Sequence, residues 1–301
     1  MKSTPQVEAL LTSWERKLRA DNKSPATLRA YRYAVESLTT WALDVGRPTE
    51  PAEQTRGDLQ DFVAHTIATM SNGTVGTRYR NLRQWFRWLA LEDEISVDPM
   101  ATMSHPQIHE KVPNIITDAD LRALIAVTSG REFNDRRDRA IIRLLLDTGM
   151  RRGELVGLNV ADVDLDGQVL LVKRSKTHRG RLVPIGTKST AELDRYMRQR
   201  RTHKAATDPA LWLGRAGPIS GALVAKMIEK RCTEAEIPKI HPHRFRHTAA
   251  HRWLLAGGQE QDLARIAGWT PGSVMLARYG ASAASERARE AHRRISPGDS
   301  L

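Results

Sequence analysis

The chain has 301 residues, a formal net charge of +12 and one cysteine, and 40% of its residues are hydrophobic. This composition excludes a disordered or fibrous chain, and the single cysteine, Cys232, excludes an internal disulfide. No apolar run approaches the roughly 18 residues of a membrane helix, and the first residues lack the apolar core of a signal peptide. We therefore expect a cytoplasmic protein of two domains.

The positive charge is concentrated in the C-terminal part of the chain. Residues 1–110 hold 13 basic and 14 acidic residues, whereas residues 111–301 hold 34 and 21. A basic excess in one part of a chain indicates a polyanionic partner. Nucleic acid is favoured over an anionic membrane surface, because the sequence has no strongly basic amphipathic helix with a bulky apolar face.

The first hundred residues are predicted to form four helices separated by polar breaks. Apolar residues recur at helical spacing in each segment, and Ser24 followed by Pro25 is a typical helix start. Thr74 is the predicted N-cap of the fourth helix. The predicted helices cover residues 7–19, 25–43, 57–70 and 75–89.

Three arginines share one face of the fourth predicted helix. Arg80, Arg83 and Arg87 recur at three- and four-residue spacing. Such a stripe is either a solvated charged face or a surface that lies against DNA phosphates, and the pattern alone leaves both open.

Prolines mark a boundary after this helical part. Asp98-Pro99 and Ser104-His105-Pro106 interrupt the helical pattern, and few core-type residues follow as far as Pro113. We therefore expect a helical domain at 1–104, an extended linker at 105–115 and a second domain at 116–301, with a C-terminal tail at 280–301.

The second domain is predicted to mix helices with a small sheet. Asp166-Gly167 is a hairpin signal, and the polar residues 175–180 form a turn between two apolar strands. The predicted strands cover 163–165, 169–173 and 181–185, and the predicted helices cover 121–127, 135–148, 189–200, 221–235, 243–256 and 261–267. The predicted fold class is therefore mainly α with a small antiparallel β-sheet.

Two clusters near this sheet could carry chemistry. Arg151 lies just after a helix-ending glycine, where its side chain can be aimed, and Glu154 is placed to hold it. Lys176 lies at the tip of the predicted turn, flanked by Arg174 and Arg179. Each of these residues could equally be an ordinary surface cation.

Two further clusters lie near the C-terminus. His243 and Arg246, three residues apart, share one face at the start of a helix. Trp269 precedes Tyr279 by ten residues, and both aromatic residues could equally be core or rim residues.

Neither a metal nor a nucleotide cofactor is predicted. His243, His247 and His251 recur every four residues, but no Asp, Glu or Cys in that segment completes a familiar ligand set. The sequence also has no glycine-rich phosphate loop with Gly-Lys-Ser/Thr.

In this order along the chain, the four clusters resemble those of the tyrosine recombinase (phage integrase) family. The resemblance runs across essentially the whole chain, and the stretches around Ser24–Tyr31 and Trp88–Pro99 are similar to the family's small helical DNA-clamping domain. The resemblance implies an N-terminal four-helix core-binding domain and an α+β catalytic domain, in a compact member without an arm-binding domain. The matching segments of the second domain are Thr148–Leu155, Ser175–Pro184, His243–Thr248 and Ala267–Tyr279.

The resemblance assigns three residues to the phosphate. It implies that Arg151 and Arg246 grip the non-bridging oxygens of the scissile phosphate. Trp269 stands where many members have histidine, and its indole would donate a hydrogen bond.

The resemblance assigns three further residues to bond breaking. It implies that Tyr279 is the nucleophile, which forms a 3′-phosphotyrosine link, and that His243 helps to take its proton. Lys176 would protonate the departing 5′ oxygen. The turn reads Ser175-Lys176-Thr177 where relatives often have Gly-Lys-Gly, so Lys173 remains an alternative to Lys176.

The implied activity is cutting and rejoining of duplex DNA without a cofactor, by a homotetramer on paired sites whose C-terminal tail docks on a neighbouring protomer. A type IB topoisomerase-like activity and a non-catalytic DNA-binding regulator of the same fold remain alternatives. The predicted DNA-contacting residues are Arg80, Arg83, Arg87, Arg174, Arg179 and Arg244.

Overall fold

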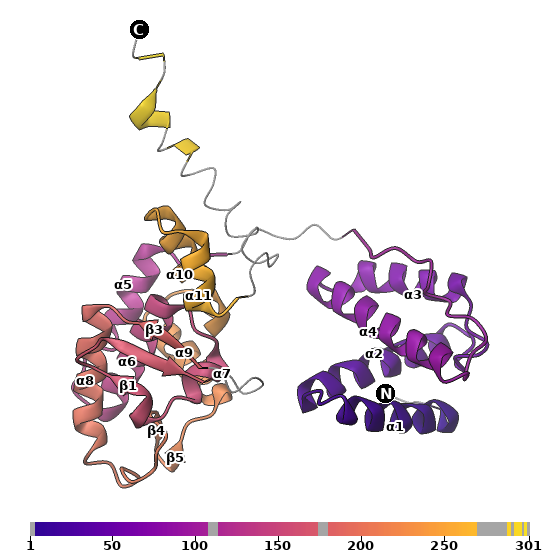
Figure 1. The fold of residues 1–301 in the computed structure, drawn as a ribbon, viewed down its shortest axis with the longest axis horizontal. Coiled ribbons are helices and arrows are strands. Elements are labelled where there is room, and N and C mark those ends of the chain that lie inside the picture. Colours follow the sequence, from indigo (N-terminus) through magenta and orange to yellow (C-terminus); the bar gives the residue numbers. More distant parts are fainter. Residues whose placement is uncertain are drawn as a thin grey trace. The chain divides into compact units, whose positions relative to one another are not determined.

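The computed structural model describes residues 4–107, 114–173 and 180–269, together with residues 288–289, 292–296 and 298–299. The chain divides into two compact units, the N-terminal unit Met1–Lys111 and the C-terminal unit Val112–Leu301 (Figure 1). Each unit has its own hydrophobic core. Among the described residues, no helix is both long and apolar enough to cross a membrane.

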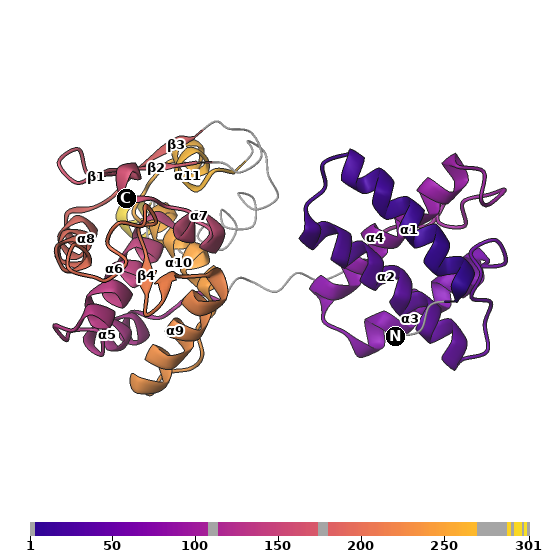
Figure 2. The same cartoon turned by 90° about the horizontal axis from the view of Figure 1, so that it is seen from below.

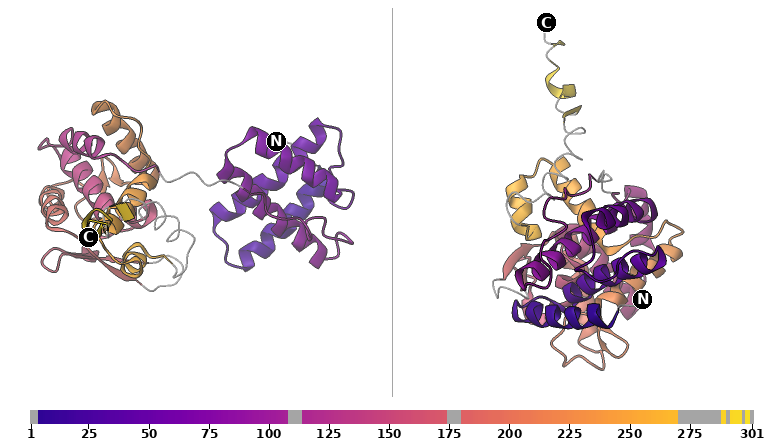
Figure 3. Two further views of the ribbon diagram at one scale, coloured as in Figure 1. Left: turned by 90° about the horizontal axis from the view of Figure 1, so that it is seen from above. Right: turned by 90° about the vertical axis from the view of Figure 1, so that its right-hand side faces the viewer.

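The described part of the N-terminal unit is a bundle of α-helices (Figure 3), and its core is rich in aromatic side chains. Trp14 and Trp85 are almost completely buried, and their rings lie 5.1 Å apart. Helix α4 packs against both α2 and α3. The helices are α1 (Pro5–Ala20), α2 (Pro25–Asp44), α3 (Arg56–Thr69) and α4 (Asn72–Leu91).

Capping side chains mark the first turns of α1, α2 and α3. The predicted start of α2 is confirmed, because the Thr27 N–H donates to the hydroxyl of the N-cap Ser24 over 3.2 Å. The predicted N-cap of α4 is wrong. Helical bonding begins three residues before Thr74, since the N–H of Val75 already donates to the Ser71 carbonyl.

The C-terminal unit is built around helix α6, which packs against α8 and α10. Ile141, Leu144 and Leu145 of α6 are completely buried. The helices of this unit are α5 (Asp118–Ala126), α6 (Phe133–Thr148), α7 (Arg152–Val156), α8 (Thr187–Arg200), α9 (Gly221–Glu234), α10 (Pro242–Leu255) and α11 (Glu260–Ala267), with a 3₁₀ turn η1 (Val160–Asp162).

A three-stranded antiparallel sheet lies at the periphery of this unit, with α11 beside β3 (Figure 2). Leu170 of β2 faces Val183 of β3, and both are buried, whereas the neighbouring pair Leu171 and Leu182 is exposed. This alternation is that of a sheet with one face on the core. The strands are β1 (Val163–Asp164), β2 (Val169–Val172) and β3 (Arg181–Pro184), in the order β1-β2-β3.

The predicted fold class, mainly α with a small antiparallel sheet, is confirmed. Three short features were not predicted: the five-residue helix α7, the 3₁₀ turn η1, and the hairpin of β4 (Leu213–Gly214) and β5 (Gly217–Pro218). All of them are too short to show a hydrophobic period.

Candidate active site

The end of α6 creates the turn that presents Arg151. Gly149 adopts a left-handed conformation with φ of 57°, which ends the helix. A Cβ atom at this position would lie 3.2 Å from the Cβ of Ala249 in α10, so glycine also permits the close approach of α6 and α10. The chain then turns into α7, whose N-cap is Arg151.

Arg151 is oriented from two sides. Its Nη1 donates to Oε1 of Glu154 over 3.0 Å, and its Nη2 donates to the Gly268 carbonyl over 3.3 Å. Its backbone N–H donates to Oε2 of Glu154 over 2.9 Å, which closes the first turn of α7. About half of the arginine side chain remains exposed, so the guanidinium is accessible to a ligand. The predicted supporting role of Glu154 is therefore visible in the structure.

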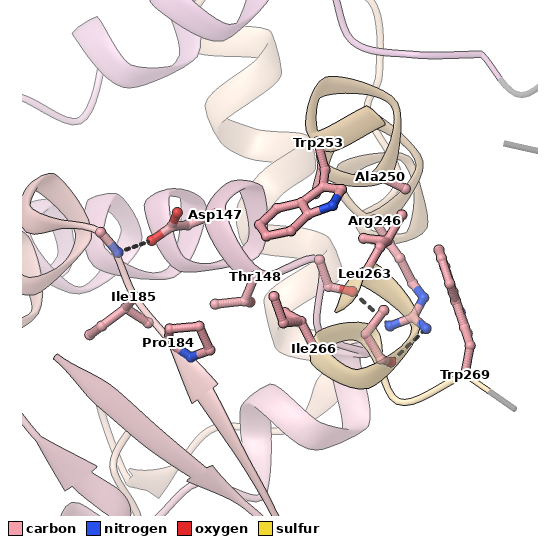
Figure 4. A pocket seen from close by; sticks show the side chains of 14 residues that line it. Asp147, Thr148, Pro184, Ile185, Arg246, Ala250, Trp253, Leu263, Ile266 and Trp269 are labelled. Atoms are coloured by element: carbon pink, nitrogen blue, oxygen red, sulfur yellow. Dashed lines mark hydrogen bonds between the residues drawn. The ribbon is translucent and has the colours of Figure 1, made fainter. Parts of the chain in front are cut away.

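Arg246 is buried, with only 2% of its surface exposed. Its Nη1 donates to the Gly149 carbonyl and its Nη2 to the Ala267 carbonyl, each over 2.8 Å. Its Cζ lies 4.7 Å from the centroid of the Trp269 ring (Figure 4). These two carbonyls orient the guanidinium.

Trp269 follows helix α11 through a second left-handed glycine, Gly268, with φ of 64°. The indole is buried and packs with Leu254 of α10 and Leu263 of α11. This packing fixes the ring beside Arg246 at the end of the described part of the site.

His243 lies in the first turn of α10, on the same helix as Arg246. Its ring contacts that of His247 edge-on, with the centroids 4.5 Å apart. Partial desolvation lowers the pKa of His243 below its usual value, and the positive charges of Arg246 and Arg151 act in the same direction. The imidazole is therefore poised to be neutral and to accept a proton near neutral pH.

A cavity of about 300 Å³ lies beside Arg246 and Trp269 (Figure 4). Apolar side chains from the end of β3 and the residue that follows it, from α10 and from α11 line much of it. Among them are Pro184, Ile185, Trp253, Leu263 and Ile266. Among the residues that the structure describes, no cluster of His, Cys, Asp or Glu side chains could hold a metal ion.

The remaining predicted catalytic residues, Lys176 and Tyr279, lie outside the described residues, as do Arg174, Arg179 and the start of the predicted tail at 280. The alternative lysine is described. Lys173 forms an ion pair with Asp162, with Nζ 2.5 Å from Oδ1 of the buried carboxylate.

The other predicted DNA contacts fall into two groups. Arg80, Arg83 and Arg87 are exposed on one face of α4 in the N-terminal unit. Arg244 instead uses its guanidinium within the C-terminal unit, where it donates to the carbonyl of Ile115 and to the side chain of Asn114.

Arg181, the first residue of β3, is a site residue that was not predicted from the sequence. Its guanidinium donates to both carboxylate oxygens of Glu154, each over 2.9 Å, and its Nε donates to the Ile266 carbonyl over 2.8 Å. An arginine that opens an apolar strand immediately after a polar turn was the available signal, but its partners lie 27 and 85 residues away.

Glu154 predicts a measurable pH dependence of stability. Its pKa falls to about 2, because the hydrogen bonds and charges of Arg181 and Arg151 outweigh the opposing effect of burial. The stability from the ionised carboxylate is therefore complete above the ordinary pKa of 4.5 and is lost as the pH falls toward 2. We expect Glu154→Gln to lower the free energy of unfolding by about 2–3 kcal/mol at pH 7.

Urea unfolding of the wild-type protein and of Glu154→Gln at pH 7, 4.5 and 3 checks this expectation. The difference between the two proteins should shrink as the pH falls. A difference of the same size at all three pH values would contradict the assigned ionisation.

Each unit of the chain matches a known family model. The model of the phage integrase family matches residues 114–286, and a model described as the phage integrase N-terminal SAM-like domain matches residues 10–96. The tyrosine recombinase XerC 2 of Ralstonia nicotianae is 30% identical over 256 residues, which cover 81% of this chain and 74% of the relative.

Two solved structures show the same fold. The XerH site-specific recombinase bound to a palindromic difH substrate, in a post-cleavage complex, matches with a TM-score of 0.74 and 15% identity, covering 94% of this chain and 84% of that one. A lambda integrase tetramer bound to a Holliday junction matches with a TM-score of 0.69 and 16% identity, covering 91% and 76%. With the family models and the XerC relative, the conclusion is that this chain belongs to the phage integrase family and is a tyrosine-type site-specific recombinase.

Proposed function

We propose that this recombinase cleaves duplex DNA at a phosphate held by Arg151, Arg246 and Trp269, and that Tyr279 attacks that phosphate to form a 3′-phosphotyrosine link. The observation that carries the proposal is the convergence of side chains from distant segments. Arg246 donates to the Gly149 carbonyl, two residues before Arg151, and Arg151 donates to the Gly268 carbonyl, which directly precedes Trp269. These two hydrogen bonds hold together the segments that contain Arg151, Arg246 and Trp269.

The charges suit a phosphodiester. The transition state of phosphoryl transfer gathers negative charge on the non-bridging oxygens, and fixed guanidiniums stabilise that charge without reorganisation. Arg246 is buried and held by two carbonyls, whereas Arg151 is half exposed. Arg246 therefore supplies a fixed charge, and Arg151 supplies the exposed guanidinium that contacts the DNA.

Proton transfer is assigned to His243 and Lys176. A phenol with a pKa near 10 is a weak nucleophile at neutral pH and needs a base. The lowered pKa of His243 keeps its imidazole in the neutral form, which can accept the proton. The departing 5′ oxygen needs an acid. The ion pair of Lys173 with Asp162 favours Lys176 for this role, because it commits the alternative lysine to a structural contact.

The assignment of the nucleophile draws support from the other tyrosines. The chain has five, and Tyr31, Tyr33 and Tyr79 belong to the N-terminal unit. Tyr196 is completely buried, and its hydroxyl donates to the Leu211 carbonyl over 3.0 Å. Tyr279 is the remaining phenol.

Since the covalent link retains the energy of the phosphodiester, rejoining needs no cofactor.

The proposal extends to the assembly. The exposed arginines of α4, together with Arg174 and Arg179, would neutralise DNA phosphates, so binding should weaken steeply with salt. Four protomers on two sites would exchange strands through a Holliday intermediate, with the tail from residue 280 docked on a neighbour. The protein would act on DNA in the cytoplasm.

Covalent capture tests this function. Purified protein is incubated with fragmented genomic DNA of its host, and the DNA that remains attached after denaturation is sequenced. We expect a few discrete sites, and exchange of strands between two DNA molecules that carry a recovered site. Relaxation of supercoiled DNA without site preference would favour a topoisomerase, and absence of attachment would favour a regulator.

The pH dependence of cleavage tests the role of His243. Because only the neutral imidazole accepts a proton, the cleavage rate at limiting DNA should rise with pH to a plateau. The lowered pKa places the midpoint of this rise below 6.5. His243→Gln should lower the plateau about 100-fold and remove the inflection. An unchanged inflection between pH 5 and 8 in His243→Gln would exclude His243 as the base.

A further inference from the structure

Arg181 joins three parts of the site that are far apart in the sequence. It opens β3, its two Nη atoms donate to Glu154 at the start of α7, and its Nε donates to the carbonyl of Ile266 at the end of α11. Only 14% of the Arg181 side chain and 12% of the Glu154 side chain are exposed. The ion pair is therefore shielded from competing water.

Glu154 is shared between two guanidiniums. Its Oε1 accepts from both Arg181 and Arg151, and its Oε2 accepts from Arg181 and from the backbone N–H of Arg151. One negative charge thus lies between two positive charges. Arg181 forms the bidentate pair, which is the stronger geometry, and Arg151 forms a single side-chain bond to the same carboxylate.

Arg181 also lies against the second anchor of Arg151. A Cβ atom added to Gly268 would lie 2.9 Å from the Cζ of Arg181, so the guanidinium packs directly on the backbone whose carbonyl accepts from Arg151. Arg181 therefore touches both groups that orient Arg151.

We propose that Arg181 is a positioning residue that neutralises Glu154 and thereby leaves the charge of Arg151 available to the scissile phosphate. This inference rests on the proposed role of Arg151. Without Arg181, the shielded Glu154 carboxylate would keep Arg151 as its guanidinium partner and would compete with the DNA phosphate for it. A carboxylate and a phosphate oxygen are equivalent acceptors for a guanidinium, so the balance of charge decides which one Arg151 serves.

Four variants test the proposal: Arg181→Gln, Arg181→Lys, the double variant Glu154→Gln/Arg181→Gln, and the control Arg198→Gln, which removes an exposed arginine paired with Asp194 on α8. The rate of covalent attachment is measured in single turnover at saturating DNA, and DNA affinity is measured separately. Thermal unfolding of each variant sets an assay temperature at which all of them are folded.

We expect Arg181→Gln to attach about 100-fold more slowly than wild type, with DNA affinity within about threefold. Arg181→Lys retains the charge and should recover about tenfold of this loss. The double variant removes the competing carboxylate together with Arg181, so it should also recover at least about tenfold. Arg198→Gln should match wild type.

If the double variant is no faster than Arg181→Gln, the proposal is overturned. When Arg181 has only a structural role, removing the Glu154 carboxylate as well would not restore the rate. Should Arg181→Gln fail to fold, the double variant decides alone, since it buries no unpaired charge. The attachment rate of the double variant should then lie within about tenfold of wild type. A rate about 100-fold or more below wild type would contradict the proposal. Failure of the wild-type protein to attach would instead refute the proposed function.

Discussion

Replacing Tyr279 by phenylalanine is expected to abolish covalent attachment to DNA, lowering its rate by at least about 1,000-fold, because a phenyl ring has no oxygen to form the phosphoester. DNA affinity should stay within about twofold of wild type, since binding comes mainly from phosphate neutralisation elsewhere. The measurement is denaturing electrophoresis of protein with labelled DNA, alongside equilibrium binding.

Tyr33→Phe is the matched control for this experiment. Tyr33 is 46% exposed in the N-terminal unit, where its ring lies under Arg78. Removing its hydroxyl deletes the same oxygen from a residue outside the C-terminal unit, so attachment should be unchanged. Full attachment by Tyr279→Phe would show that another residue is the nucleophile.

Arg246→Gln is expected to reduce the cleavage rate by about 1,000-fold, because it removes the fixed charge that we propose holds the phosphate. It should also lower the free energy of unfolding by about 1–3 kcal/mol, since the buried carbonyls of Gly149 and Ala267 lose their donors. Arg246→Lys keeps a charge but lacks the planar fork of donors that bonds both carbonyls, so it should recover only part of the rate. Single-turnover cleavage and urea unfolding measure the two effects.

The comparison of Arg246→Gln with Arg198→Gln separates catalysis from stability. Arg198 lies on the surface of α8 and is 63% exposed, so its removal should change neither quantity appreciably. A cleavage rate of Arg246→Gln within about tenfold of wild type would exclude Arg246 from the phosphate site.

The sequence predicted most helices because their signals are local. The Ser24-Pro25 start of α2 and the glycine that ends α6 act within a few residues, so capping rules find them. The start of α4 was misplaced because Asn72 and Gly73, both poor helix formers, occupy its first turn. Helix α7 was missed because its five residues are too few to show a hydrophobic period.

The candidate site residues were predicted from motif order and family resemblance, and neither of these gives the geometry between them. Arg246 reaches a carbonyl 97 residues away, and Arg151 reaches one 117 residues away. Tertiary packing alone brings such pairs together. Arg181 was missed because its partner Glu154 is also distant in the sequence. The hydrogen bonds of Arg244 to residues 114 and 115 were missed for the same reason.

The most direct measurement of the central claim is the position of the DNA adduct on the wild-type chain. After nuclease digestion of the covalent complex and proteolysis, mass spectrometry identifies the peptide that carries the residual nucleotide. We expect a nucleotide linked through its 3′ phosphate to Tyr279. A nucleotide on any other residue, or one linked through its 5′ phosphate, would contradict the arrangement in which Arg151 and Arg246 present a phosphate to Tyr279.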